Sequence, residues 1–115
     1  MSRKNPERPH AGRPVPAVVF AALGDKTRLS LIARLSAGQR SSIAQLTERS
    51  RLTRQAVTKH LRVLERAGLV RSTRHGRESL FALDPEPMRQ MQDYLSSVSR
   101  QWDQALARLK LFVEE

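Results

Sequence analysis

The sequence contains no cysteine, few aromatic residues and no long apolar run. Without cysteine the chain can form no disulfide, no thiolate metal site and no cysteine nucleophile. No apolar stretch approaches the roughly 20 residues that span a bilayer, and the first residues lack the apolar core of a signal peptide. We therefore expect a cytoplasmic protein with no membrane partner. Aromatic residues make up only 4% of the chain, but the hydrophobic total of 39% is that of a globular protein, and 115 residues suffice for one modest core.

Side chains suited to catalysis or metal binding are also scarce. The chain has 3 histidines and 5 glycines, and they form no Ser-His-Asp ordering, no phosphate-binding glycine loop and no metal-ligand cluster. We predict no catalytic residue, no metal site and no cofactor. An enzyme is the class that the sequence favours least.

Acidic residues are rare in one part of the chain. Residues 1–83 hold 17 basic and 5 acidic residues, a net charge of +12, whereas residues 84–115 hold 4 basic and 6 acidic residues, a net charge of −2. Within residues 49–77, 9 basic residues accompany a single acidic one, Glu65. This excess predicts a polyanionic partner. Nucleic acid is favoured over an acidic membrane surface, because the apolar helix faces are needed to form a core.

Two helices are predicted after a basic N-terminal tail. Residues 1–14 carry three prolines among basic residues, and we expect them to be flexible. Residues 16–23 form a short apolar helix that Gly24 ends, and Asp25 is placed to cap a second helix that Gly38 ends. The apolar stripe predicted for this second helix consists of Leu29, Ile32, Ala33 and Leu35.

A third, shorter helix is predicted to begin at Ser42 and to run to about Arg49. Ser42 and Gln45 have the spacing of a capping box, in which each side chain bonds to the backbone of the other residue. Ile43 and Leu46 are its apolar contribution to the core.

A fourth helix has a clear signal at each end. Thr53 is a good N-cap, and Gly68 followed by Leu69 has the sequence form of a Schellman stop. Apolar residues at spacings of four and three predict one buried face, formed by Val57, Leu61 and Leu64. The opposite face carries basic and hydrogen-bonding side chains, namely Arg54, Gln55, Thr58, Lys59 and Arg62. Two helices joined by a short turn, the second basic and capped, predict a helix-turn-helix whose second helix fits the DNA major groove.

A β-hairpin is predicted directly after this helix. The segment LVRSTRHGRESLFAL reads as two short strands around a turn at His75-Gly76, a register that pairs Val70 with Phe81. Arg74 and Arg77 would then lie at the tip. Such a basic hairpin is a wing, which can lean on a phosphate or enter the minor groove.

A last helix is predicted to begin at Asp84 and Pro85, an N-cap residue followed by proline, and it should continue almost to the end of the chain. Its apolar residues repeat at alternating spacings of three and four, at Met88, Met91, Leu95, Val98, Trp102, Ala105, Leu109 and Phe112. This pattern is typical of a coiled-coil seam. A helix of roughly 40 Å is too long for a small domain to cover its stripe, so we expect a homodimer. The alternative is that the stripe packs on residues 16–23 of the same chain.

The residues resemble one family of regulators. The segments LGDKTRLSLIARLSAG and LTRQAVTKHLRVLERAGLV, followed by a wing ending in LFAL, are similar to the ArsR/SmtB family of winged-helix bacterial repressors. The resemblance covers about residues 17–83 closely and the final helix by position and character. It implies a mainly α winged helix-turn-helix fold with a small β-hairpin, a homodimer through the terminal helices, and repression at a roughly palindromic operator.

The metal sites of that family have no counterpart in this sequence. Ser42 and Ala44 stand where metal-sensing members carry a Cys-x-Cys pair, and the three histidines, His10, His60 and His75, lie outside the last helix. The chain therefore resembles the branch without a recognised metal sensor. An unidentified small-molecule effector stays open as a partner.

We divide the chain into a tail at residues 1–14, a DNA-binding domain at residues 15–83 and a dimerisation helix at residues 84–115. Because recognition helices enter the groove by their N-terminal end, the predicted base-reading residues are Arg54, Gln55 and Thr58. The predicted phosphate contacts are Arg51, Lys59, His60 and Arg62, and those of the wing are Arg74, His75 and Arg77. The predicted dimer interface comprises Val19, Met91, Leu95, Val98, Trp102, Ala105, Leu109 and Phe112.

Several alternatives stay open for these residues. The basic face could simply be solvated, the wing tip could contact nothing, and His60 could pack against its own domain instead of DNA. For the whole protein, a nucleoid-type protein that coats DNA without reading it and a winged-helix adaptor that binds protein compete with a sequence-specific repressor, for which double-stranded operator DNA is the partner.

Overall fold

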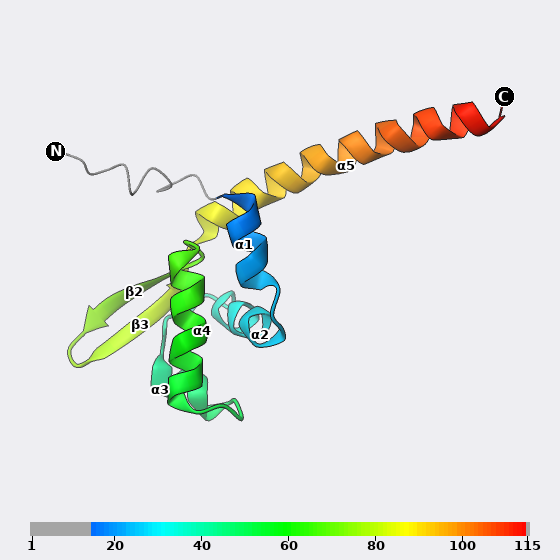
Figure 1. Cartoon of the computed structure of the whole chain (residues 1–115). Coiled ribbons are helices and arrows are strands. Elements are labelled where there is room, and N and C mark those ends of the chain that lie inside the picture. Colours follow the sequence, from blue (N-terminus) through cyan, green and yellow to red (C-terminus); the bar gives the residue numbers. More distant parts are fainter. Residues whose placement is uncertain (1–14, 115) are drawn as a thin grey trace.

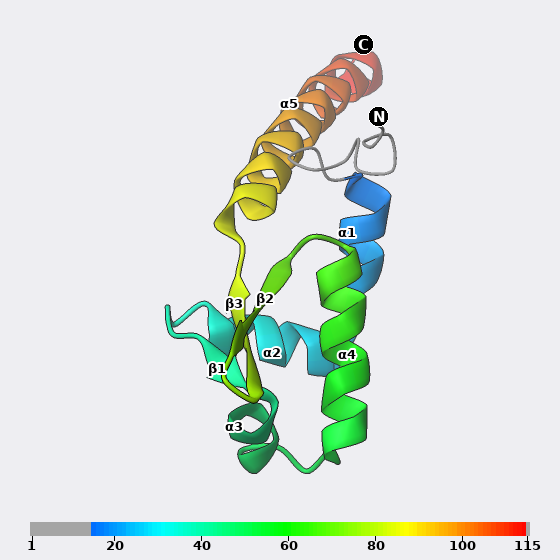
Figure 2. The same ribbon diagram turned by 90° about the vertical axis from the view of Figure 1, so that its left-hand side faces the viewer.

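The computed structural model describes residues 15–114, so the expected tail at residues 1–14 lies outside the described residues. The chain forms helices with one small sheet (Figures 1 and 2). In chain order the elements are α1 (Pro16–Leu23), α2 (Lys26–Leu35), β1 (Ser41–Ser42), α3 (Ile43–Glu48), α4 (Arg54–Arg66), β2 (Val70–His75), β3 (Glu78–Leu83) and α5 (Pro85–Glu114). This is a winged helix-turn-helix with a long terminal helix, and it confirms the fold class expected from the sequence.

The predicted N-caps are all present. The carboxylate of Asp25 accepts a hydrogen bond of 3.0 Å from the Arg28 backbone at the start of α2. Ser42 and Gln45 form the complete capping box of α3, and the Thr53 hydroxyl accepts from the third residue of α4. These bonds satisfy backbone N–H groups that a helix leaves unpaired at its first turn.

The end of α4 is a Schellman motif. The Leu69 N–H donates to the Leu64 carbonyl at 3.0 Å, and the Gly68 N–H donates to the Glu65 carbonyl at 2.9 Å. Gly68 has a φ of +83°, a conformation that glycine adopts without a steric penalty. The stop turns the chain directly from the recognition helix into the first strand of the wing.

The core lies where α1, α2, α3 and α4 meet one face of the sheet. Its largest fully buried side chains are Phe81, Leu35, Leu46, Leu61, Leu64, Leu69, Val19, Val57 and Val70. The stripe predicted for α2 was partly wrong. Leu31 is buried beside Ile32 and Leu35, whereas Leu29 is 51% exposed and Ala33 is exposed. Leu31 and Leu35 are one turn apart, so the face centred on them, and not the one through Leu29, meets the core.

The sheet is antiparallel, with strand order β1-β3-β2. Its register differs from the prediction, because Val70 pairs with Leu83 and the two-residue turn is Gly76-Arg77. Gly76 has a φ of +63° and Arg77 does not have a positive φ, as in a type II′ turn with glycine at its first central position. The shift keeps Val70 and Phe81 on the same face, and both are buried. The short strand β1 was not predicted.

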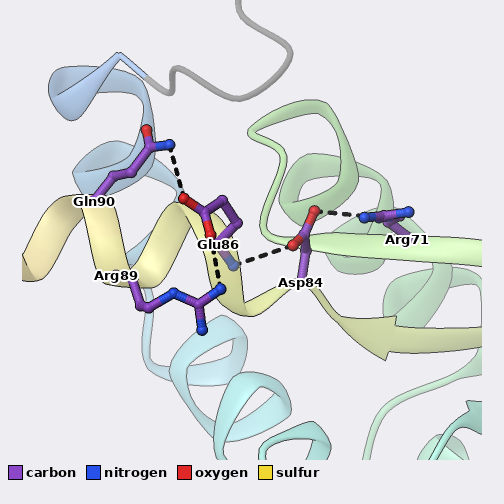
Figure 3. A network of polar contacts seen from close by, with 5 residues as sticks. All are labelled: Arg71, Asp84, Glu86, Arg89 and Gln90. Carbon is purple, nitrogen blue, oxygen red and sulfur yellow. Dashed lines mark hydrogen bonds and ion pairs between the residues drawn. The ribbon is translucent and has the colours of Figure 1, made fainter.

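A polar network joins the wing to α5 (Figure 3). The Asp84 carboxylate accepts from the Glu86 backbone at 3.1 Å and from Nε of Arg71 in β2 at 3.1 Å. Glu86 in turn accepts from the side chains of Arg89 and Gln90. Asp84 therefore begins α5 and ties it to the neighbouring strand.

Only the first turns of α5 pack on the domain. Met91 is buried and Met88 is partly buried against the core. From there α5 runs away from the other elements (Figure 1), and the molecule extends over 68 × 44 × 22 Å. Trp102 is 65% exposed and Phe112 is 77% exposed. The apolar stripe of α5 is thus left uncovered within one chain, and the alternative that it packs back on α1 holds only for its N-terminal part.

Candidate nucleic-acid interface

The outward face of α4 carries a stripe of long polar side chains. These residues recur at spacings of four, three and four and lie opposite the buried Val57, Leu61 and Leu64. All four are exposed, and they are Gln55, Lys59, Arg62 and Arg66. Of the predicted residues, Gln55, Lys59 and Arg62 belong to this stripe. Arg66 was missed, although its spacing from Arg62 would have identified it.

Arg54 and Thr58 lie on the flank of α4 that faces the wing. The Thr58 hydroxyl donates to the Arg54 carbonyl at 2.7 Å, so its oxygen is left as an acceptor toward solvent. Arg54 and the turn residue Arg77 line one hollow of about 180 Å³, together with Ser42 and Ser79. The recognition helix and the wing thus each contribute an arginine to the same hollow, which the acidic residue Glu78 also lines.

The wing is exposed along most of its length. Figure 2 shows that the hairpin of β2 and β3 extends beside α4. Arg74, His75 and Arg77 are exposed, and Nε of Arg74 donates to the Gly76 carbonyl at 3.3 Å. Because of the corrected register, Arg77 lies in the turn itself and Arg74 lies within β2. Arg51, in the turn before α4, is exposed as well.

Glu65 connects the recognition helix to the wing. Its carboxylate accepts from the Arg62 guanidinium at 2.8 Å and from the Ser72 hydroxyl of β2 at 2.7 Å. The same guanidinium lies over the Phe81 ring, 5.7 Å from its centroid. Burial raises the pKa of Glu65, but the hydrogen bonds from Ser72 and Arg62 outweigh it and hold the pKa below its ordinary value. Glu65 is therefore a carboxylate at neutral pH.

His60 contacts its own domain. Its Nδ1 lies 3.2 Å from an Arg28 guanidinium nitrogen and 3.8 Å from the Asp25 carboxylate. Because a guanidinium can only donate, Nδ1 is the acceptor in the contact with Arg28. These contacts favour the packed alternative over the predicted phosphate contact.

Arg28 is the centre of this contact. Besides His60, its guanidinium bonds the carbonyls of Ala22 at 2.6 Å and Ala21 at 3.5 Å, at the end of α1. The hydrogen bond from its backbone to Asp25 is the main cause of the lowered pKa of that carboxyl. Sequence reasoning did not assign Arg28 a role, since its partners lie on two other helices.

The predicted dimer residues occupy different environments. Val19 is fully buried in its own core, so its side chain cannot reach a second chain, and that prediction was wrong. Its neighbours Val18 and Phe20 are 49% and 38% exposed and lie on either side of the outward-facing Ala17 and Ala21. Met91 is buried by its own domain. The remaining predicted residues lie on α5 with partly or fully exposed side chains, and they are Leu95, Val98, Trp102, Ala105, Leu109 and Phe112.

The fold and this basic surface define a winged helix-turn-helix protein that binds DNA. Residues 23–73 match the model of a protein family whose description is "Helix-turn-helix domain". The HTH-type transcriptional regulator YuzN of Bacillus subtilis strain 168 is 39% identical over 79 residues, which cover 64% of this chain and 86% of that relative. The structure of an ArsR-like transcriptional regulator from Rhodococcus sp. RHA1 is 33% identical with a TM-score of 0.75, over 90% of this chain and 93% of the other.

A crystal structure of an ArsR family transcriptional regulator is similar over 76% of this chain and 89% of its own, with 28% identity and a TM-score of 0.69. The chain belongs to the ArsR family of helix-turn-helix transcriptional regulators. It is a DNA-binding transcriptional regulator.

The resemblance places Ser42 at a metal-ligand position of the family, and in this structure Ser42 has a structural role. Ser42, which stands where metal sensors have a cysteine, is 4% exposed and caps α3. Across residues 15–114, no three or more histidine, cysteine, aspartate or glutamate side chains are grouped so that they could hold a metal ion. None of the helices within the same residues has the length and apolar character that a bilayer span requires.

Proposed function

We propose that the protein is a homodimeric repressor that reads a roughly palindromic operator with α4. The observation that carries this proposal is the pairing of two surfaces in one chain: an exposed basic recognition helix and an uncovered apolar stripe along α5. The basic helix is suited to bind DNA, and the apolar stripe is suited to pack against a second copy of the chain. Two recognition helices related by a twofold axis match two half-sites of a palindrome.

Base reading falls to residues near the N-terminus of α4. Gln55 is exposed on the outward stripe, and Arg54 is exposed one position before it. Glutamine pairs with adenine and arginine with guanine in bidentate geometry, and each such pair contributes roughly 1–3 kcal/mol of discrimination. Thr58 adds an acceptor beside them. Lys59, Arg66, Arg51 and the wing arginines hold phosphates and set the position of α4 in the groove.

The dimer would form through α5 and α1. The positions that flank the seam are nearly uncharged, with Arg108 as the exception among Gln92, Tyr94, Ser99, Gln101, Leu106 and Val113. Such flanks indicate an interface wider than a two-helix seam, to which α1 can contribute its exposed Val18 and Phe20. The Phe20 and Tyr94 rings, 6.1 Å apart, already join α1 to α5 within one chain.

The same region is the best candidate for an effector site. A groove of about 460 Å³ between α1 and the start of α5 is lined mainly by apolar side chains, including Phe20, Leu23, Met88 and Leu95. A second copy would cover this groove, so a small molecule bound there would act on the dimer. In this proposal residues 15–83 form the DNA-binding unit and residues 84–115 the dimerisation unit, and the protein works in the cytoplasm with its DNA.

The test of this function compares specific with nonspecific binding. DNA fragments that the purified protein retains from its genome are sequenced to obtain an operator, and affinities for that operator and for a scrambled duplex are measured at one salt concentration. A repressor should prefer the operator by roughly 10³-fold or more near physiological salt. Equal affinities would support the nucleoid-type alternative, and no affinity for either DNA would support the protein-binding adaptor.

A further inference from the structure

We propose that Glu65 is a positioning residue that holds Arg62 against the wing, keeps that cation off the DNA backbone and thereby lowers the affinity for DNA of every sequence. The proposal rests on the proposed reading of DNA by α4. Glu65 is the only acidic residue within residues 49–77, a stretch with 9 basic ones. An acidic side chain beside a DNA-binding face lowers the affinity for every DNA sequence, so its place in this helix calls for a physical account.

The geometry shows what the carboxylate does. Arg62 belongs to the outward stripe of α4, where Gln55 and Lys59 have no hydrogen-bond partner among the described residues. The Arg62 guanidinium, in contrast, is turned toward the wing, bonded to Glu65 at 2.8 Å and placed over the ring of Phe81. Two interactions therefore compete with a phosphate for one guanidinium: the hydrogen-bonded ion pair with Glu65 and the cation–π contact with Phe81.

Ser72 strengthens this arrangement from the wing side. Its hydroxyl donates to the second oxygen of Glu65 at 2.7 Å, so the carboxylate is fixed between α4 and β2. With both oxygens engaged, Glu65 cannot follow Arg62 out to a phosphate without giving up the bond to the wing. The side chains of Arg62 and Glu65 are 47% and 31% exposed, so the pair lies close enough to solvent for a phosphate to reach it.

The consequence for recognition follows from the nature of phosphate contacts. A phosphate contact adds the same affinity to operator and to random DNA, and it makes both more sensitive to salt. By withholding one such contact in each protomer, Glu65 lowers the affinity for operator and random DNA alike and makes both less sensitive to salt, while the base-reading residues Arg54 and Gln55 are unaffected. The ratio between operator and nonspecific affinity is left unchanged, because the withheld contact would add equally to both.

The experiment is a double-mutant cycle on a scrambled duplex. The wild type, Glu65→Gln, Arg62→Gln and the double variant are compared by fluorescence anisotropy over a salt series. Each protomer should gain one phosphate contact in Glu65→Gln, so the slope of log affinity against log salt should steepen by about 0.9 per protomer. Nonspecific affinity should rise by at least about threefold near 0.1 M salt. In the Glu65→Gln background, Arg62→Gln should abolish both gains, whereas in the wild type it should leave the slope unchanged.

Two further variants separate the mechanism from simpler effects. Glu48→Gln removes one exposed carboxylate from α3 without releasing an arginine, so its salt slope should match that of the wild type. Ser72→Ala frees the carboxylate from the wing but leaves its charge beside Arg62, so its slope should steepen by less than that of Glu65→Gln. Thermal unfolding of each variant verifies that it is folded.

The results that overturn the proposal are distinct from those that overturn the function. If Arg62→Gln flattens the salt slope of the wild type, Arg62 already contacts phosphate and Glu65 withholds nothing. An unchanged slope in folded Glu65→Gln, or an equal steepening in Glu48→Gln, also refutes it. A wild type that binds operator and scrambled DNA equally well refutes sequence-specific reading itself, whatever the variants do.

Discussion

Arg28 and His60 stand 32 positions apart in the chain, and their side chains meet at 3.2 Å. The same guanidinium bonds the last carbonyls of α1. One side chain from the first turn of α2 therefore fixes the recognition helix α4 relative to α1, the helix that we place at the dimer interface. In the proposed dimer, the distance between the two recognition helices depends on the angle between α4 and α1 within each protomer.

Replacing Arg28 with Gln should destabilise the domain. Glutamine is too short to reach both the Ala22 carbonyl and His60, and hydrogen bonds that involve a charged group are typically worth about 1.5–3 kcal/mol. We expect a loss of about 2 kcal/mol in the free energy of unfolding, measured by urea denaturation. Arg89→Gln is the control, because it removes only an exposed ion pair with Glu86, which should contribute little to stability. Equal losses in the two variants would contradict a special role for Arg28.

Arg54→Ala and Gln55→Ala should each reduce the preference for operator over scrambled DNA. The reason is the loss of a bidentate base contact, and the expected reduction is roughly 1–3 kcal/mol for each variant, or about 5- to 150-fold. Titration of both duplexes at one salt concentration measures it. Lys59→Gln serves as the control and should weaken both duplexes by the same factor, since a phosphate contact is blind to sequence. If the preference for operator DNA is unchanged in both alanine variants, Arg54 and Gln55 are not the base-reading residues.

Leu109→Asp combined with Phe112→Asp should yield a folded monomer. Both side chains are exposed, at 56% and 77%, and lie beyond the part of α5 that packs on its own domain, so the winged domain should remain intact. Sedimentation equilibrium measures the mass, and circular dichroism verifies the fold. Operator affinity should fall steeply, because the second half-site loses its effective-concentration advantage. The control Gln104→Asp lies on the opposite face of α5 and should remain a dimer; an unchanged dimer in the double variant would refute the seam.

Glu65 should make the stability of the protein sensitive to acid. Its pKa in the folded protein lies below the ordinary value of 4.5, which applies to the unfolded chain. The unfolded state therefore binds the proton first on acidification, and the stabilisation by Glu65 is complete above that value and is lost as the pH falls through the folded pKa. Urea unfolding between about pH 6 and pH 3 should show a shallower decline for Glu65→Gln than for the wild type. Parallel declines would contradict this assignment.

Local signals predicted the helix boundaries well. Thr53, the Ser42–Gln45 capping box and Gly68 act through hydrogen bonds that span only three to five residues, so their spacing in the sequence is sufficient to recognise them. The recognition helix and its outward face followed from the same short-range patterns. The family resemblance then pointed to the fold as a whole.

The predictions that were wrong concern features that depend on contacts between distant segments of the chain. Leu31, and not Leu29, is buried because the angle at which α2 crosses the core determines which face of the helix is covered. Both faces carry a leucine, so the sequence pattern alone does not show which one is buried. The burial of Val19 and the contacts of Arg28 have the same origin. The hairpin register followed from the conformation of Gly76, which fits the first position of its turn better than the second.

The reach of α5 beyond its own domain separates two kinds of information along the chain. In the proposed dimer, the choice of DNA depends on a few side chains near the start of α4, and the choice of partner chain depends mainly on α5 residues three turns or more past the wing. Substitutions in one stretch leave the other unaltered, so a duplicated copy of such a gene can acquire a new operator while still pairing with its parent, or change its mate while keeping its operator.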